Sequence, residues 1–157
     1  MMMLMFVPAF IIYWLDFVPE GTQLLSSLII LAVSCYTFAN NNIKTSDYYF
    51  SGFPALWNVL ILYFYLLEFS PLLNFYLILF FALLTFIPFK YLHPFRVVEF
   101  RKTSLCMLGL WMITTVVLLY FPESGEVLTI SSFILWCFSN LYFLFINVIR
   151  STKREQI

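Results

Sequence analysis

The sequence predicts an all-α membrane protein: a bundle of about six transmembrane helices with both ends of the chain on the cytoplasmic side. Of the 157 residues, 63% are hydrophobic and 10% are charged, which leaves too little polar surface for a water-soluble fold. Polar residues divide the apolar sequence into six runs, and every basic residue falls between or after the runs on one side of the predicted membrane. Composition, segmentation and charge therefore agree on the same topology.

The six apolar runs are separated by charged residues, proline, glycine and asparagine. A helix needs roughly 20 residues to cross about 30 Å of hydrocarbon, so the first and third runs are short and their ends or tilts stay open. No linker or internal repeat separates the runs, which predicts one transmembrane domain over residues 1–149 and a basic cytoplasmic tail over 150–157. The expected helices are 1–15, 24–39, 55–67, 72–89, 104–121 and 127–149.

The connections between the runs set the orientation. The first and fifth connections are acidic, whereas the second, the fourth and the tail carry all the bases. Because cytoplasmic loops of membrane proteins are enriched in lysine and arginine, this side is predicted to be cytoplasmic. The bases are Lys44, Lys90, Arg96, Arg101, Lys102, Arg150, Lys153 and Arg154.

Several functions have little support in the residue pattern. The bases do not form a stripe that could follow a phosphate backbone, so nucleic-acid binding is not expected. The three cysteines lie inside apolar runs without a CxxC pair, which predicts buried small hydrophobic residues. His93 is the only histidine and has no triad-like acid nearby, so a catalytic or metal role is not expected.

The second connection has two interpretations, and both stay open. It reads NNNIKTSDYYFSGFPALWN, and its polar groups need water, protein or ligand partners at the membrane surface. In the structural interpretation, asparagine ends one helix, aromatic residues anchor the interface and Pro54 opens the next helix. In the functional interpretation it binds a phosphate and a quaternary ammonium group such as choline through cationic, acidic and aromatic side chains. The candidate substrate-binding residues are Lys44, Asp47, Tyr49, Phe50, Trp57 and Asn58.

The fourth connection, KYLHPFRVVEFRK, is predicted to fix topology and to attract anionic lipid headgroups. Each base near such a surface contributes about 1 kcal/mol. The candidate headgroup-binding residues are Lys90, Arg96, Arg101 and Lys102.

Two segments carry a resemblance to a known family. The pattern K-T-x-D-x-Y-F-x-G-F-P-x-x-W-N is filled by Lys44, Thr45, Asp47, Tyr49, Phe50, Gly52, Phe53, Pro54, Trp57 and Asn58. Together with L-L-T-F-I-P-F-K-Y-L-H-P at residues 83–94, it resembles bacterial phosphatidylcholine synthases, which are CDP-alcohol phosphatidyltransferases. The resemblance implies a multi-pass protein of the bacterial inner membrane. It also implies that CDP-diacylglycerol and choline react to phosphatidylcholine and CMP, with Mg²⁺ or Mn²⁺ as the expected metal of the intact family.

The sequence departs from that family at the catalytic motif. The family carries D-G-x-x-A-R followed by G-x-x-x-D-x-x-x-D, whereas the aspartates here are Asp16 and Asp47, assigned to opposite membrane faces. Metal-assisted phosphoryl transfer needs clustered carboxylates, so no catalytic or metal-ligating residue is assigned to this chain. The expectation is the later part of a synthase, inactive alone, with a separate segment as the partner that carries the motif. The alternative is a non-catalytic membrane protein that binds lipids or serves assembly.

Overall fold

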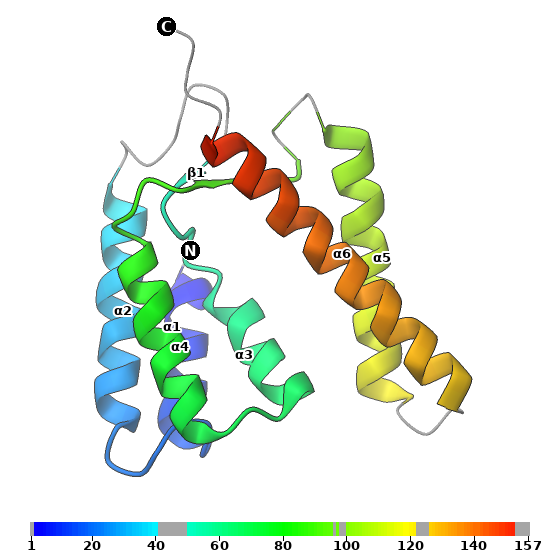
Figure 1. Cartoon of the computed structure of the whole chain (residues 1–157). Helices are drawn as coiled ribbons and strands as arrows, with labels where there is room; N and C mark the ends of the chain where they lie inside the picture. Colours follow the sequence, from blue (N-terminus) through cyan, green and yellow to red (C-terminus); the bar gives the residue numbers. More distant parts are fainter. Residues whose placement is uncertain (1, 41–49, 96, 98–99, 122–125, 153–157) are drawn as a thin grey trace, which may run out of the picture. The chain divides into compact units, whose positions relative to one another are not determined.

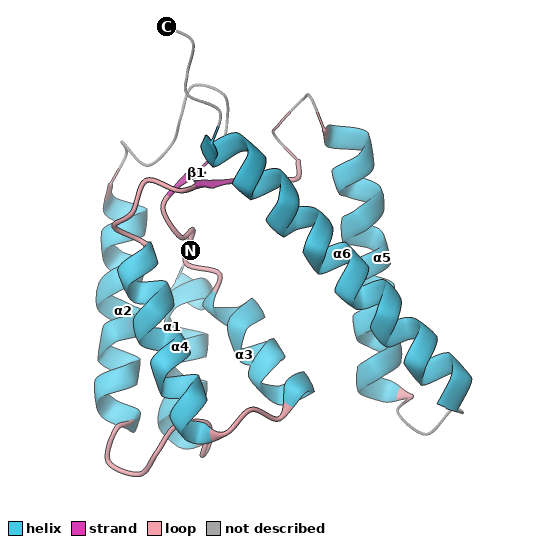
Figure 2. Cartoon of the chain, in the orientation of Figure 1, coloured by secondary structure: helices cyan, strands magenta, loops and turns pink. Residues whose placement is uncertain are grey.

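The computed structural model describes residues 2–40, 50–95, 97, 100–121 and 126–152 (Figure 1). These residues fall into two compact units, which are described separately. The first contains residues up to 45 and Phe50–Phe89, and the second contains Lys90–Ile157 together with Ser46–Tyr49. Helices dominate both units (Figure 2), so the predicted all-α class and the six predicted helices are confirmed.

The first unit contains four helices and one short strand. Its helices have 13, 17, 11 and 14 residues, which at 1.5 Å per residue corresponds to lengths of about 16 to 26 Å. In chain order the elements are α1 (Met2–Trp14), α2 (Gln23–Ala39), β1 (Phe50–Ser51), α3 (Trp57–Leu67) and α4 (Pro71–Leu84).

Helices α1 and α2 pack closely through small residues. The buried face of α2 includes three serines, and the Ser27 hydroxyl donates a hydrogen bond of 2.8 Å to the Ala9 carbonyl of α1. Small side chains let helix backbones approach, and a hydroxyl bonded across the contact adds to the packing. The buried residues of α2 are Ser26, Ser27, Ile30, Val33, Ser34 and Thr37.

Helix α4 begins and ends at recognisable signals. Ser70 caps its first turn by accepting a hydrogen bond from the Leu73 backbone N–H at 3.4 Å, and proline occupies the next position. The prediction that this helix continues to residue 89 is wrong: it ends at Leu84. Pro88 explains the early end, because in a continued helix its ring would clash with the Leu84 carbonyl and it has no N–H to donate to it.

Asn74 holds the α1–α2 and α3–α4 connections together. Asn74 of α4 is buried, and its amide donates to the Phe17 carbonyl at 2.8 Å and to the Phe69 carbonyl at 3.4 Å. The ring of Phe17 also lies 6.4 Å from that of Phe64 in α3. The α1–α2 connection and the α3–α4 connection are therefore held to the same helix end.

The second unit is a helical hairpin with a short strand before it: β2 (Lys90–Tyr91), α5 (Arg101–Tyr120) and α6 (Glu126–Thr152). The two helices are antiparallel neighbours (Figure 1). The Trp136 indole N–H donates to the Thr115 hydroxyl at 3.1 Å.

Within the described part of the chain, two helices are long and apolar enough to cross a membrane, over Arg101–Tyr120 and Val127–Ile149. The four helices of the first unit are shorter than the roughly 20 residues that a perpendicular crossing requires. Six transmembrane crossings, the inward orientation of both ends and the single domain over residues 1–149 therefore stay predictions.

Large apolar side chains cover the outer faces of both units. On α6, Phe138 and Leu141 are more than half exposed, as are Phe10 on α1 and Phe80 on α4. Such faces suit a lipid environment, because water-soluble monomers rarely expose contiguous apolar patches of this kind. The expectation of buried cysteines is wrong: Cys35 and Cys106 are exposed and Cys137 is partly exposed, since each lies on an outward helix face.

Candidate functional site

The turn after β1 is fixed to the C-terminal end of α4. The Gly52 N–H donates to the Phe89 carbonyl at 2.9 Å, and the Phe53 N–H donates to the Leu84 carbonyl at 3.4 Å. Gly52 has a φ of +89° and Ala55 a φ of +54°, so the chain turns sharply between β1 and α3. The predicted G-F-P motif therefore forms a tight turn that is bonded to the last residues of α4 and the segment after it.

Gly52 is the residue that this turn requires. A Cβ atom at this position would overlap the Thr85 carbonyl oxygen and lie 3.1 Å from the carbonyl carbon. Positive φ is also unfavourable for residues with a Cβ. Both the backbone angle and the close approach to Thr85 therefore select glycine.

Phe53 packs between two other aromatic residues. Its ring centroid lies 5.2 Å from that of Trp57, edge to face, and 4.9 Å from that of Phe81 in α4. Trp57 is 0% exposed, and its indole N–H has no hydrogen-bond partner among the residues that the structure describes. Trp57 thus lies within the aromatic packing of the turn, and its predicted contact with a quaternary ammonium group stays a prediction.

The other candidates of the second connection are placed only in part. Asn58 lies in the first turn of α3 and is half-buried. Phe50 begins β1, but its side chain is not among those described. Lys44, Asp47 and Tyr49 lie outside the described residues. The structure therefore brings Phe53 and Trp57 together with α4 and leaves the proposed substrate contacts untested.

The fourth connection is bonded to the last turns of α6. The Lys90 N–H donates to the Ser151 hydroxyl and the Leu92 N–H donates to the Asn147 side-chain oxygen, both at 2.8 Å. Ser151 in turn donates to the Asn147 carbonyl at 2.8 Å. Burial raises the pKa of Tyr91, which lies between the residues that make these bonds, to about 12.

The predicted headgroup-binding bases fall in different surroundings. Arg101 and Lys102 are exposed in the first turn of α5, and Lys90 is half-buried in β2. Arg96 lies outside the described residues. Next to Arg101 and Lys102, three hydroxyls meet: the Tyr142 hydroxyl of α6 lies 2.9 Å from that of Thr103 and 3.1 Å from that of Ser104.

Sequence reasoning missed the residues that hold these segments in place. Phe53 was read as part of a motif and not as its packing centre. Asn147 and Ser151 are one helical turn apart in an otherwise apolar run, and that spacing could have indicated a polar contact. Tyr142 gave no comparable signal, because a lone tyrosine in an apolar helix is more often an interfacial anchor.

The described residues contain no group of three or more His, Cys, Asp or Glu side chains that could hold a metal ion. They therefore do not fit the divalent metal that the family resemblance implies.

Comparison with known proteins identifies phosphatidylcholine synthases of several bacteria as relatives. The phosphatidylcholine synthase of Pseudomonas aeruginosa is 36% identical over 148 residues, which are 94% of this chain and 61% of that protein. Those of Bradyrhizobium diazoefficiens and Mesorhizobium japonicum are each 35% identical, over 83% and 67% of this chain. This chain is homologous to bacterial phosphatidylcholine synthases.

The chain matches only part of the length of each synthase. The chain spans 61%, 50% and 39% of the lengths of the Pseudomonas, Bradyrhizobium and Mesorhizobium proteins. No protein-family profile matches the sequence. No solved structure matches it.

Proposed function

We propose that this chain provides the later part of a bacterial phosphatidylcholine synthase and acts with a segment that carries the catalytic aspartates. The observation that carries the proposal is the similarity to synthases over 94% of the chain in the Pseudomonas comparison. The sequence pattern agrees, since the matched residues include the aromatic motif of the second connection but no D-G-x-x-A-R. The protein is proposed to lie in the bacterial inner membrane with both ends inside.

In this proposal the reaction joins choline to the phosphatidyl group of CDP-diacylglycerol. The choline oxygen forms a bond to the phosphatidyl phosphorus, the bond from that phosphorus to CMP breaks, and the choline hydroxyl proton passes to a base. This chain is proposed to contribute no base and no metal ligand. Its proposed part is to bind the trimethylammonium group on the aromatic faces of Tyr49 and Phe50 and to neutralise phosphate charge through Lys44.

The turn at Gly52 gives that part a structural basis. Residues 52–57 are fixed by backbone bonds to the end of α4 and by the contacts of Phe53 with Trp57 and Phe81. A binding segment that ends in a fixed turn loses less conformational entropy when a ligand binds.

A chimera with the Pseudomonas relative tests the proposal. The matched segment of that synthase is replaced by this chain, and membranes of a bacterium that makes no phosphatidylcholine are assayed with labelled choline and CDP-diacylglycerol. The chimera is expected to form phosphatidylcholine and to release CMP, whereas this chain alone is expected to give neither. Replacing Tyr49 or Phe50 by leucine in the chimera is expected to raise the KM for choline more than it lowers kcat.

Two outcomes would contradict the proposal. A chimera that inserts fully but makes no phosphatidylcholine would favour the alternative, a non-catalytic membrane protein for lipid binding or assembly. Activity of this chain alone would show that the reaction needs no separate aspartate segment. Insertion is measured by reporter fusions after each predicted helix, which also test the six crossings.

A further inference from the structure

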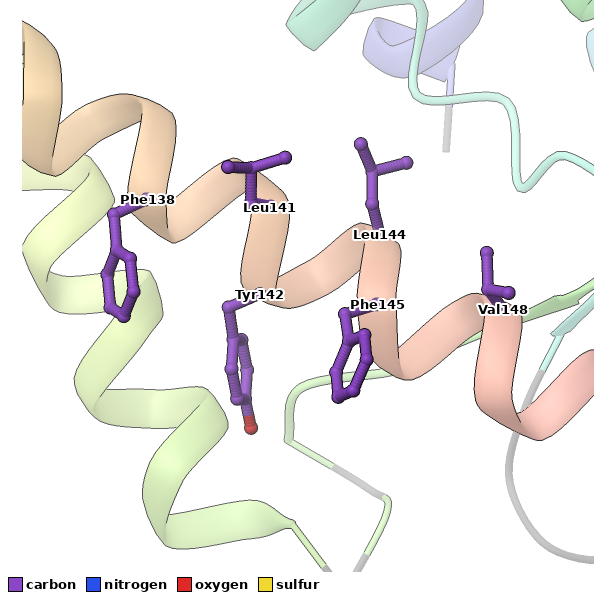
Figure 3. Close-up of a pocket in the computed structure, with 6 residues that line it drawn as sticks. All are labelled: Phe138, Leu141, Tyr142, Leu144, Phe145 and Val148. Carbon is purple, nitrogen blue, oxygen red and sulfur yellow. The ribbon is translucent and has the colours of Figure 1, made fainter.

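The C-terminal half of α6 carries an apolar groove on its exposed face. The groove has a volume of about 570 Å³ and is lined by α6 alone. Figure 3 shows two rows of side chains along the helix, with the three aromatic rings on one side and the aliphatic residues on the other. The lining residues are Phe138, Leu141, Tyr142, Leu144, Phe145 and Val148.

Tyr142 connects this apolar groove to a cluster of hydroxyl groups. Its ring lines the groove, and its hydroxyl meets those of Thr103 and Ser104 in the first turn of α5. Phe138 lies one turn away from Tyr142, about 6 Å along the helix axis in the direction of the α5–α6 connection. Leu144, Phe145 and Val148 lie on the other side of Tyr142 along α6, so the hydroxyl contact lies beside the middle of the groove.

Two basic residues lie next to that hydroxyl cluster. Arg101 and Lys102 directly precede Thr103 and both are exposed. The described neighbours within this end of the hairpin, Thr103, Ser104 and Tyr142, carry hydroxyls and no acidic group. Positive charge, hydroxyl groups and an apolar groove thus lie next to one another on this hairpin.

The geometry points to a binding site for an anionic glycerophospholipid on this hairpin. The phosphate lies beside Arg101 and Lys102 within reach of the Thr103 hydroxyl, and one acyl chain lies in the α6 groove. Charge complementarity selects the occupant: a zwitterionic lipid offers the same acyl chain but no net charge to the two bases. The cytoplasmic leaflet, where the charge bias places this end of α5, supplies such lipids. The inference does not rest on the proposed synthase reaction.

Native mass spectrometry of the full chain in detergent micelles tests the site. The protein is titrated with palmitoyl-oleoyl phosphatidylglycerol or with the phosphatidylcholine that has the same chains, and bound lipids are counted. Phosphatidylglycerol is expected to bind more tightly. The double variant Arg101→Gln and Lys102→Gln is expected to weaken its binding by about 30-fold, since each base contributes about a factor of five at a lipid surface. The charge-matched control is Lys153→Gln with Arg154→Gln in the tail.

The groove has its own matched pair of variants. Leu141→Trp fills the groove, whereas Ile134→Trp adds a side chain of the same size to α6 outside the groove. The two positions are equally exposed, since Leu141 is 62% and Ile134 61% exposed. Leu141→Trp is expected to weaken phosphatidylglycerol binding and Ile134→Trp to leave it unchanged, with the same circular dichroism for both.

Three results would overturn the site: equal binding of the two lipids, equal losses in the two charge variants, or equal effects of the two tryptophans. The lipid-binding measurements do not depend on the chimera assay. The lipid site can therefore fail while the synthase proposal holds, and the synthase proposal can fail while the lipid site holds.

Discussion

Replacing Gly52 by alanine is expected to destabilise the first unit more than replacing either of two other glycines. The backbone of Gly52 has a φ of +89°, and a left-handed conformation costs a residue with a Cβ roughly 1–2 kcal/mol. The new Cβ would also overlap the Thr85 carbonyl oxygen, which belongs to backbone and cannot rotate away. Overpacking of this kind costs about 1–3 kcal/mol, so the total is about 2–5 kcal/mol.

Two further glycines separate these contributions. Gly21 has a φ of +81° with nothing within 4 Å of an added Cβ, so Gly21→Ala measures the backbone cost alone. Gly109 lies inside α5 with open space and no positive φ, so Gly109→Ala is expected to stabilise by about 0.5–1 kcal/mol through helix propensity. The difference between Gly52→Ala and Gly21→Ala isolates the overlap with Thr85.

The assay is reversible unfolding in mixed micelles, with sodium dodecyl sulfate as denaturant and far-ultraviolet circular dichroism as the signal. The three variants and the parent chain are compared at the same total detergent concentration. If Gly52→Ala loses no more stability than Gly21→Ala, then the turn does not contact Thr85 as described, and the fixed binding segment loses its support.

Three further predictions concern single side chains. Asn147→Leu removes the acceptor of the Leu92 N–H, and hydrogen exchange at that amide is expected to accelerate by at least about tenfold; an unchanged rate would refute the bond. Tyr91 has its pKa raised to about 12, so its contribution to stability is complete below pH 10 and is lost as the pH rises through 12. The unfolding midpoint of Tyr91→Phe should therefore fall less between pH 10 and 12 than that of the parent. Asn74→Ala leaves the Phe17 carbonyl without its partner at 2.8 Å and is expected to cost about 1–2 kcal/mol in the micelle assay; a loss near zero would show that water replaces the amide.

Much of the fold could be predicted from local patterns. Apolar runs predicted six helices, and five of them begin and end close to the expected positions. The fourth was extended too far, because the residues after Leu84 are as apolar as those before it. Hydropathy does not distinguish a helix from an apolar segment that leaves it, whereas Pro88 does.

The candidate site was less accessible to sequence reasoning. The pattern around Gly52 identified a special segment but could not tell a ligand-facing aromatic from a packed one. Trp57 is fully buried beside Phe53, and Phe53 in turn packs against Phe81 of another helix. No spacing along the chain encodes that contact.

By itself, the sequence predicted a membrane protein and determined the helical class and the relationship to phosphatidylcholine synthases, because composition, apolar run length and residue identity are properties of the chain. Only the tertiary structure decided which polar and aromatic groups meet. These contacts join residues more than 30 positions apart in the sequence. They are the close approach of Gly52 to Thr85, the hydrogen bonds of Asn147 and Ser151 to residues 90–92, and the hydroxyl contacts of Tyr142. Such contacts depend on how helices pack in space, and local periodicity does not carry that information.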